Sequence, residues 1–187
     1  MVDTYVHVIV GITVCSRIAD IWTTYEVTPT LRLEANTVAR RFGWRFAIPS
    51  ILVGLVPYAW PPLGVIIFTA SFLVAAANAS KIVMAKALGE EGLAALAQRV
   101  ILATPPWPGL LFLVSPALFI GALGAAILLL YPEASEWGYY VGIGMFAYAL
   151  AILVWYPVRY FRVRATAKQR PNNATQTVCT NARAPQA

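Results

Sequence analysis

Hydrophobic residues in this chain are grouped into long runs, without the shorter alternating patterns of a soluble domain. Five runs approach the ~20 residues that an α-helix needs to cross the hydrocarbon core of a bilayer. They predict an all-α, polytopic transmembrane bundle within residues 1–164, with spans at about 5–22, 44–60, 63–85, 109–131 and 137–158. Residues 165–187 are polar and contain no aromatic side chain, so we expect a disordered tail there.

Two segments leave alternatives open. Pro49 and Pro57 interrupt the second run, so residues 44–85 form either two full spans or a re-entrant hairpin. Residues 86–104 mix small, charged and apolar side chains. This pattern is typical of an amphipathic helix that lies along the membrane surface. A long third helix that protrudes from the membrane fits the same residues.

Basic residues predict the orientation of the bundle. When the five spans are threaded through a bilayer, thirteen of the fourteen Lys and Arg residues fall on one side, and Arg17 lies within the first span near that side. Short cytoplasmic loops are rich in Lys and Arg. The N-terminus is therefore expected outside the cell and the C-terminus in the cytoplasm. All six tryptophans fall at predicted span ends, where aromatic belts form.

Composition supports a membrane protein and excludes other classes. Hydrophobic residues make up 59% of the chain and charged residues only 12%, against about 25% charged residues in soluble domains. The net charge of +6 is spread over loops that flank the spans, which indicates attraction to anionic lipids rather than nucleic-acid binding. Cys15 lies in the first span and Cys179 in the tail, so no disulfide is expected.

Polar residues gather near the predicted cytoplasmic end of the spans. Thr13, Arg17, Asp20 and Thr24 follow one another at spacings of four, three and four, which places them on one helix face. We predict a polar cluster formed by Arg17, Asp20, Thr24, Glu34, Asn36, Asn78 and Lys81. Such a cluster either binds an ion, a lipid headgroup or a small anion, or holds the helices together by hydrogen bonds.

Small residues on the last two spans predict close helix packing. Gly121 and Ala125 lie four residues apart, as do Gly138 and Gly142. The short turn between these spans favours mutual packing, and a docking face for another subunit is the alternative. Ser50 and Ser115 each lie beside a proline in an apolar helix. We expect each hydroxyl to bond back to a backbone carbonyl of its own helix.

No enzyme motif is present, and no catalytic or metal-binding residue is predicted. The chain lacks a phosphate-binding glycine loop, H-E-x-x-H and G-x-S-x-G. His7 is the only histidine, which excludes ligation of a haem by two histidines. It could bind a pigment or haem from the outer side, or simply be a polar residue at the membrane surface. The sequence does not identify a cofactor.

The segment DIWTTYEVTPTLRLEAN resembles the signature of an uncharacterised family of small prokaryotic multi-pass membrane proteins, in which Asp-x2-Thr-Thr is followed by Glu-x-Asn-Pro. The matching residues are Asp20, Thr23, Thr24, Glu34 and Asn36, whereas Thr37 replaces the family's proline. The resemblance covers roughly residues 5–85. It implies a location in the cytoplasmic (inner) membrane and no known activity.

Three functions are compatible with these patterns. The hypothesis we favour is a non-enzymatic accessory or assembly subunit of a larger membrane complex, because catalytic motifs are absent and small-residue faces are present. The second is a small transporter of ions or solutes that uses the polar cluster. The third is a membrane enzyme acting on lipid headgroups, with Asp20 and Glu34 as acid and base.

Overall fold

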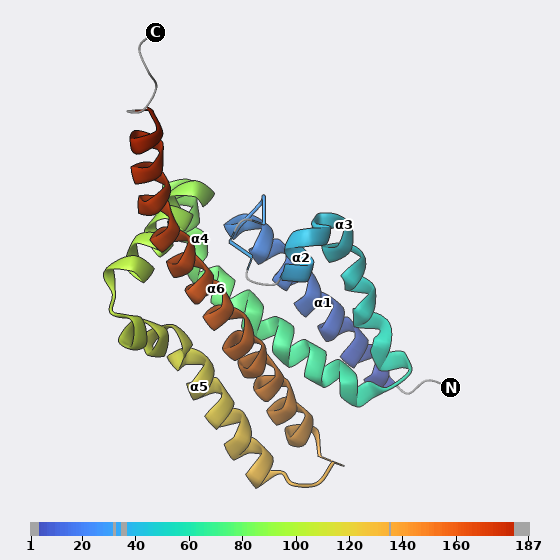
Figure 1. Ribbon diagram of the computed structural model, residues 1–187. Helices are drawn as coiled ribbons and strands as arrows, with labels where there is room; N and C mark the ends of the chain where they lie inside the picture. Colours follow the sequence, from blue (N-terminus) through green and yellow to red (C-terminus); the bar gives the residue numbers. More distant parts are fainter. Residues whose placement is uncertain (1–3, 32, 35–36, 135, 182–187) are drawn as a thin grey trace.

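The computed structural model is helical, and no strand occurs in the part of the chain that it describes (Figure 1). It describes residues 4–31, 33–34, 37–134 and 136–181, with the backbone alone at 37–39 and 169–181. The elements in chain order are α1 Thr4–Val27, α2 Thr37–Phe42, α3 Trp44–Ala47, the 3₁₀ helix η1 Pro49–Tyr58, α4 Pro61–Ala103, α5 Pro106–Leu130 and α6 Trp137–Asn181.

Four helices are long and apolar enough to cross a membrane: α1, α4, α5 and, in α6, Trp137–Lys168. The prediction of a bundle of apolar helices is confirmed at this level. Their outer faces carry large exposed apolar side chains, such as Phe112 and Leu129 on α5, which are 81% and 83% exposed. Such faces are expected where lipid is the solvent.

The predicted second span corresponds to α3 and η1, a shorter apolar segment of residues Trp44–Tyr58. Proline explains its irregularity, because Pro57 lacks the N–H that an α-helix would use at that position. The segment lies against α1 from end to end. The Trp44 indole N–H donates to the Pro29 carbonyl (2.8 Å) just beyond one end of α1. Near the other end, Tyr58 Oη lies 3.1 Å from His7 Nδ1.

A sharp bend divides α4 at Gly89, whose φ of 69° and ψ of 168° are not helical (Figure 1). Such a φ is accessible to glycine and strained for most other residues. The helix therefore does not continue straight past Gly89. It turns, and Leu93 in its second part packs in one buried cluster with Val27 and Ala85.

Basic side chains of α4 and α6 lie together at one end of the bundle. Lys86 pairs with Glu26 (3.1 Å) there, and Arg159 donates to the Leu33 carbonyl (2.5 Å). Arg164 donates to the Ile101 carbonyl (2.7 Å) near the end of α4, where a cation is favourable. Segments far apart in the sequence thus meet at the end for which the charge pattern predicted a common side.

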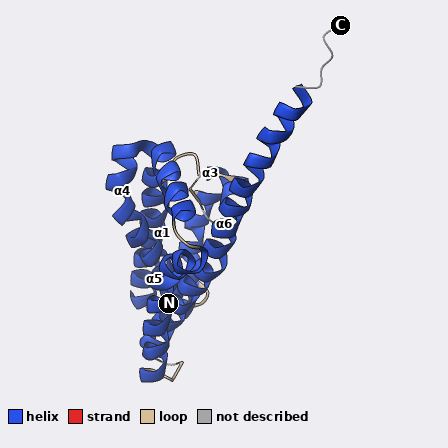
Figure 2. Ribbon diagram, turned by 60° about the vertical axis from the view of Figure 1, so that its left-hand side comes forward, coloured by secondary structure: helices blue, strands red, loops and turns tan. Residues whose placement is uncertain are grey.

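At the same end, α6 continues to Asn181 and extends past the other helices (Figures 1 and 2). It enters the segment 165–187 that we predicted to be disordered. Residues 182–187 lie outside the described residues. A helical turn without packed neighbours gains little stability from propensity alone, and the prediction of a disordered tail in solution stays a prediction.

Glycines set the spacing of α5 and α6. A Cβ on Gly142 would lie 2.8 Å from Leu128 Cγ and 3.0 Å from the Gly124 carbonyl oxygen. A Cβ on Gly121 would lie 3.2 Å from that of Ala149. Predicted packing residues Gly121 and Gly142 thus lie in the contact between these two helices, as mutual packing requires.

The other two predicted packing positions behave differently. Ala125 is half-buried, and next to it a Cβ on Gly124 would lie 3.0 Å from the Gly142 carbonyl oxygen. Gly138 lies against the Tyr131 ring in the turn, where an added Cβ would come within 2.6 Å of the ring. Helical spacing from Gly121 did not predict that Gly124 also faces α6, because the face that α5 presents depends on its rotation against α6.

Candidate functional site

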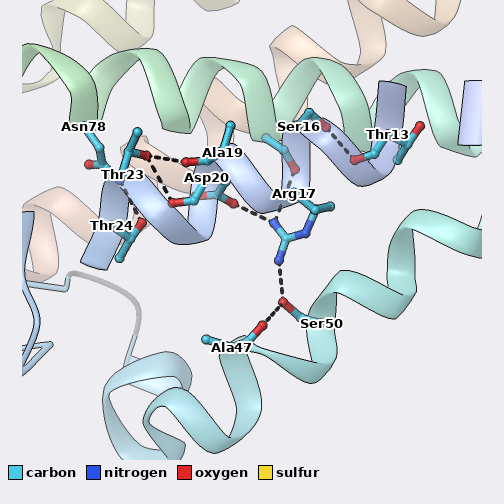
Figure 3. A network of polar contacts seen from close by, with 11 residues as sticks. Thr13, Ser16, Arg17, Ala19, Asp20, Thr23, Thr24, Ala47, Ser50 and Asn78 are labelled. Atoms are coloured by element: carbon cyan, nitrogen blue, oxygen red, sulfur yellow. Dashed lines mark hydrogen bonds and ion pairs between the residues drawn. The ribbon is translucent and has the colours of Figure 1, made fainter. Parts of the chain in front are cut away.

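Arg17 lies at the centre of a polar network inside the apolar bundle (Figure 3). Its guanidinium donates to Asp20 Oδ2 (2.6 Å), to Ser50 Oγ (2.6 Å) and to Ser71 Oγ (3.3 Å). Asp20 is on α1, Ser50 on η1 and Ser71 on α4, so one side chain connects three elements. The side chains of Arg17 and Asp20 are 20% and 13% exposed.

Local sequence explains how this network forms. Arg17 and Asp20 are three residues apart on α1, a spacing that brings side chains together on one helix face. Ser50 lies in the first turn of η1, where its hydroxyl donates to the Ala47 carbonyl (2.5 Å) and its oxygen accepts from Arg17. The expected bond of Ser115 to its own helix is confirmed by the Phe112 carbonyl (3.0 Å). Ser50 also bonds back to a preceding carbonyl, but that of Ala47 belongs to α3 rather than to η1.

The sequence analysis missed the role of Ser50 and Ser71 as partners of Arg17. One signal was available for Ser50. It lies six residues from the interfacial Trp44, and Arg17 lies five residues from the interfacial Trp22, so their depths in a membrane are similar. No comparable signal marks Ser71, which is 4% exposed in the middle of α4.

A second contact joins α1 to α4 closer to the basic end. Asn78 Nδ2 donates to Thr24 Oγ1 (2.9 Å), which gives this amide the partner that an apolar environment demands. Thr23 bonds instead to the Ala19 carbonyl of its own helix (2.8 Å). On the other side of the network, Thr13 Oγ1 contacts the carbonyls of Ile9 (2.7 Å) and Gly64 (3.2 Å), the latter on α4.

The predicted cluster is therefore only partly assembled. Arg17, Asp20, Thr24 and Asn78 lie in the contact between α1 and α4. Lys81 is half-buried, and no hydrogen bond or ion pair joins it to another described residue. Glu34 lines a cavity with Arg159 and also lies close enough to Asp20 for the two carboxylates to interact electrostatically. Asn36 lies outside the described residues.

His7 occupies an exposed position on α1 next to Tyr58. The two rings meet edge to face, with centroids 5.6 Å apart. This pairing fixes the end of η1 against α1. Among the described residues, no group of three or more His, Cys, Asp or Glu could hold a metal ion. Ligation of a pigment or haem by His7 stays a prediction.

Comparison of the chain with protein-family models, with curated proteins and with solved structures gave no match. The resemblance of the Asp20–Asn36 segment to a family of small membrane proteins stays a prediction.

Proposed function

We propose that this chain is an integral membrane protein that crosses the bilayer five times. Four crossings correspond to α1, α4, α5 and α6. The fifth is the segment Trp44–Tyr58, which lies along α1 between Pro29 and His7. Fifteen residues of α-helix would cover only about 22 Å. Since η1 is a 3₁₀ helix with a rise of about 2.0 Å per residue, α3 and η1 together cover about 26 Å, close to the hydrocarbon core of about 30 Å.

The basic end of the bundle is proposed to face the cytoplasm of a prokaryotic cell, at the inner membrane. The distribution of charge supports this orientation. The end where α1 and α4 finish carries Arg45, Lys86, Arg159 and Arg164, whereas the opposite turn carries Glu133 and Glu136. Cytoplasmic loops are enriched in Lys and Arg. The second part of α4, after Gly89, is then placed at the membrane surface, with Arg99 exposed.

Within the membrane, we propose the role of a non-enzymatic accessory or assembly subunit of a larger complex. The observation that carries this proposal is the use of the polar residues. Arg17 directs its contacts to Asp20, Ser50 and Ser71, and Asn78 to Thr24, so these groups join the helices of the bundle. Interhelical hydrogen bonds are an established means of fixing helix arrangement in membranes.

The assembly role can be tested by purifying the tagged, full-length protein from native membranes in a mild detergent. We expect a particle that contains other membrane polypeptides in fixed stoichiometry and persists on size-exclusion chromatography. Arg17→Met should loosen the bundle, so that the variant is less stable and no longer co-purifies with the partners. Recovery of the protein as a monomer from native membranes, with no co-purifying polypeptide, contradicts the accessory role.

One observation favours a transporter as the second candidate. Arg17 Nε is buried and has no hydrogen-bond partner in the described part of the chain. An N–H in this position could receive a transient anion or water. If Asp20→Asn leaves the purified protein folded but abolishes a solute flux into reconstituted vesicles, the transporter replaces the accessory role. An enzyme that uses Asp20 and Glu34 as acid and base is less favoured, because Asp20 is paired with Arg17 and Glu34 lines a cavity with Arg159.

A further inference from the structure

A cavity of about 210 Å³ lies at the basic end of the bundle, apart from the Arg17 network. Its walls come from α2, from the second part of α4, from α6 and from the loop that follows α1. Its polar lining consists of Glu34, Arg40, Gln98, Arg159 and Arg162. Three guanidinium groups against one carboxylate leave a formal charge of +2 around a small space.

The loop after α1 is held in place above this cavity. The Glu90 carboxylate accepts from the Thr28 hydroxyl and from the Thr30 N–H (3.0 Å). The Thr28 oxygen in turn accepts from the Leu33 N–H (3.1 Å), and the Leu33 carbonyl accepts from Arg159. Arg159 is thus fixed by the protein itself, and the cavity has a defined wall.

Arg40 and Arg162 differ from Arg159 in this respect. Neither side chain has a hydrogen bond or ion pair with any residue that the structure describes. Guanidinium groups that share a cavity repel one another. An anion bound between them is attracted to each group, and this attraction offsets the repulsion. The planar donor fork of arginine matches the oxygens of a phosphate group.

The size and the remaining walls restrict the ligand. Pockets for drug-sized molecules have volumes of about 300–1,000 Å³, so this cavity suits a phosphate group with a short substituent. Ile101 and Val158 make part of the wall apolar, which suits carbon atoms next to the phosphate. Trp155 and Tyr156 lie just before Arg159 on α6, and such aromatic residues mark the level of lipid headgroups.

We propose that this cavity binds a phosphate-bearing anion between Arg40, Arg159 and Arg162. The same chemistry is offered by the headgroup of an anionic phospholipid and by phosphate dissolved in the cytoplasm. The site does not depend on the accessory role proposed above. A lipid can supply the phosphate group only if the basic end lies at the membrane surface, as proposed above.

The test compares two double variants of the full-length protein in detergent. Arg40→Gln/Arg162→Gln removes the two guanidinium groups that lack protein partners and leaves Arg159 in place. Arg41→Gln/Arg99→Gln is the matched control, because it removes the same charge from exposed positions that do not line the cavity. Each protein is titrated with dioctanoyl phosphatidylglycerol, with dioctanoyl phosphatidylcholine and with inorganic phosphate, and its thermal midpoint is recorded.

We expect one of the two anionic probes to raise the midpoint of the unsubstituted protein and of the control variant in a saturable manner. The cavity variant should need about tenfold more probe, or bind none, since hydrogen bonds to charged groups are lost. Response to phosphatidylglycerol alone identifies a lipid, and response to inorganic phosphate identifies a dissolved anion. Three results overturn the proposal: no response to either anion, equal loss in both double variants, or an equal response to phosphatidylcholine.

Discussion

Arg17→Met is the substitution that probes the bundle most directly. It keeps a long, flexible side chain on α1 but removes the guanidinium that contacts Asp20, Ser50 and Ser71. Asp20 would then keep a largely buried carboxylate, 13% exposed, without its cationic partner. The folded state should lose stability both through the contacts removed and through the charge left behind.

The expected size follows from the geometry. Removing one partner of a fully buried ion pair costs about 3–5 kcal/mol, whereas single hydrogen bonds between membrane helices contribute about 0.6 kcal/mol on average and up to about 1.7 kcal/mol. Arg17 makes two contacts at 2.6 Å but is 20% exposed. We therefore expect a loss of about 2–4 kcal/mol, with the lower end below the range for fully buried pairs because both side chains are partly exposed.

A double-mutant cycle with Asp20→Asn separates the ion pair from simple loss of packing. The amide introduced by Asp20→Asn carries no charge that could be left unpaired, so Arg17→Met should cost less in that background than in the original chain. The expected coupling is about 1–3 kcal/mol. Unfolding is followed by tryptophan fluorescence as detergent micelles are titrated with a denaturing detergent.

Two controls make the result specific to the network. Ser50→Ala should cost about 1 kcal/mol, since it removes one interhelical contact without stranding a charge. Ser80→Ala should change nothing measurable, because Ser80 is exposed and bonds only to the Ala77 carbonyl of its own helix. The reasoning is refuted if Arg17→Met and Asp20→Asn add within about 0.5 kcal/mol, or if Ser80→Ala costs as much as Ser50→Ala.

Three further substitutions, with Gly11→Ala as a control, test the packing of the helices by the same unfolding measurement. Gly142→Leu should destabilise the protein by about 1–3 kcal/mol, because it forces the α5 backbone at Gly124 away. Gly11→Ala should be neutral or stabilising, because the space around its Cβ is open. Similar losses for both variants would refute the close contact of α5 and α6. Gly89→Ala should cost about 1–2 kcal/mol because of the positive φ, and no loss would mean that α4 does not bend there. Asn78→Ala should cost up to about 1.7 kcal/mol, and a gain in stability would show that its amide has no partner in α1.

The amino-acid pattern revealed the features that depend on one helix at a time. Run length located the long apolar helices, and helical spacing placed Arg17 beside Asp20. It also identified Asn78 as an amide that needs a partner and Thr24 as a polar residue of the same cluster. These results need only the period of the α-helix and the cost of an unpaired polar group in an apolar environment.

Features that depend on how helices are rotated and aligned were not predictable in this way. Ser71 faces Arg17 only because α4 presents that side to α1. Glu34 was grouped with Asp20 by its position in the sequence, and the two carboxylates do interact electrostatically. The place of Glu34 in a cavity wall beside Arg159 of α6 was not predictable from the sequence. The close approach of η1 to α1, where Gly54 lies against Val14 and leaves no room for a Cβ, also depends on how these two segments are aligned.

The most direct test of the five crossings is the accessibility of single cysteines in intact cells, in a chain whose own Cys15 and Cys179 are replaced. Ala59→Cys follows η1, Ala134→Cys lies in the turn after α5, and Thr166→Cys lies on the basic end of α6, all at exposed positions. A membrane-impermeant maleimide should label Ala59→Cys and Ala134→Cys from outside, and Thr166→Cys only after permeabilisation. Protection of Ala59→Cys while Ala134→Cys reacts, or labelling of Thr166→Cys from outside, contradicts the account.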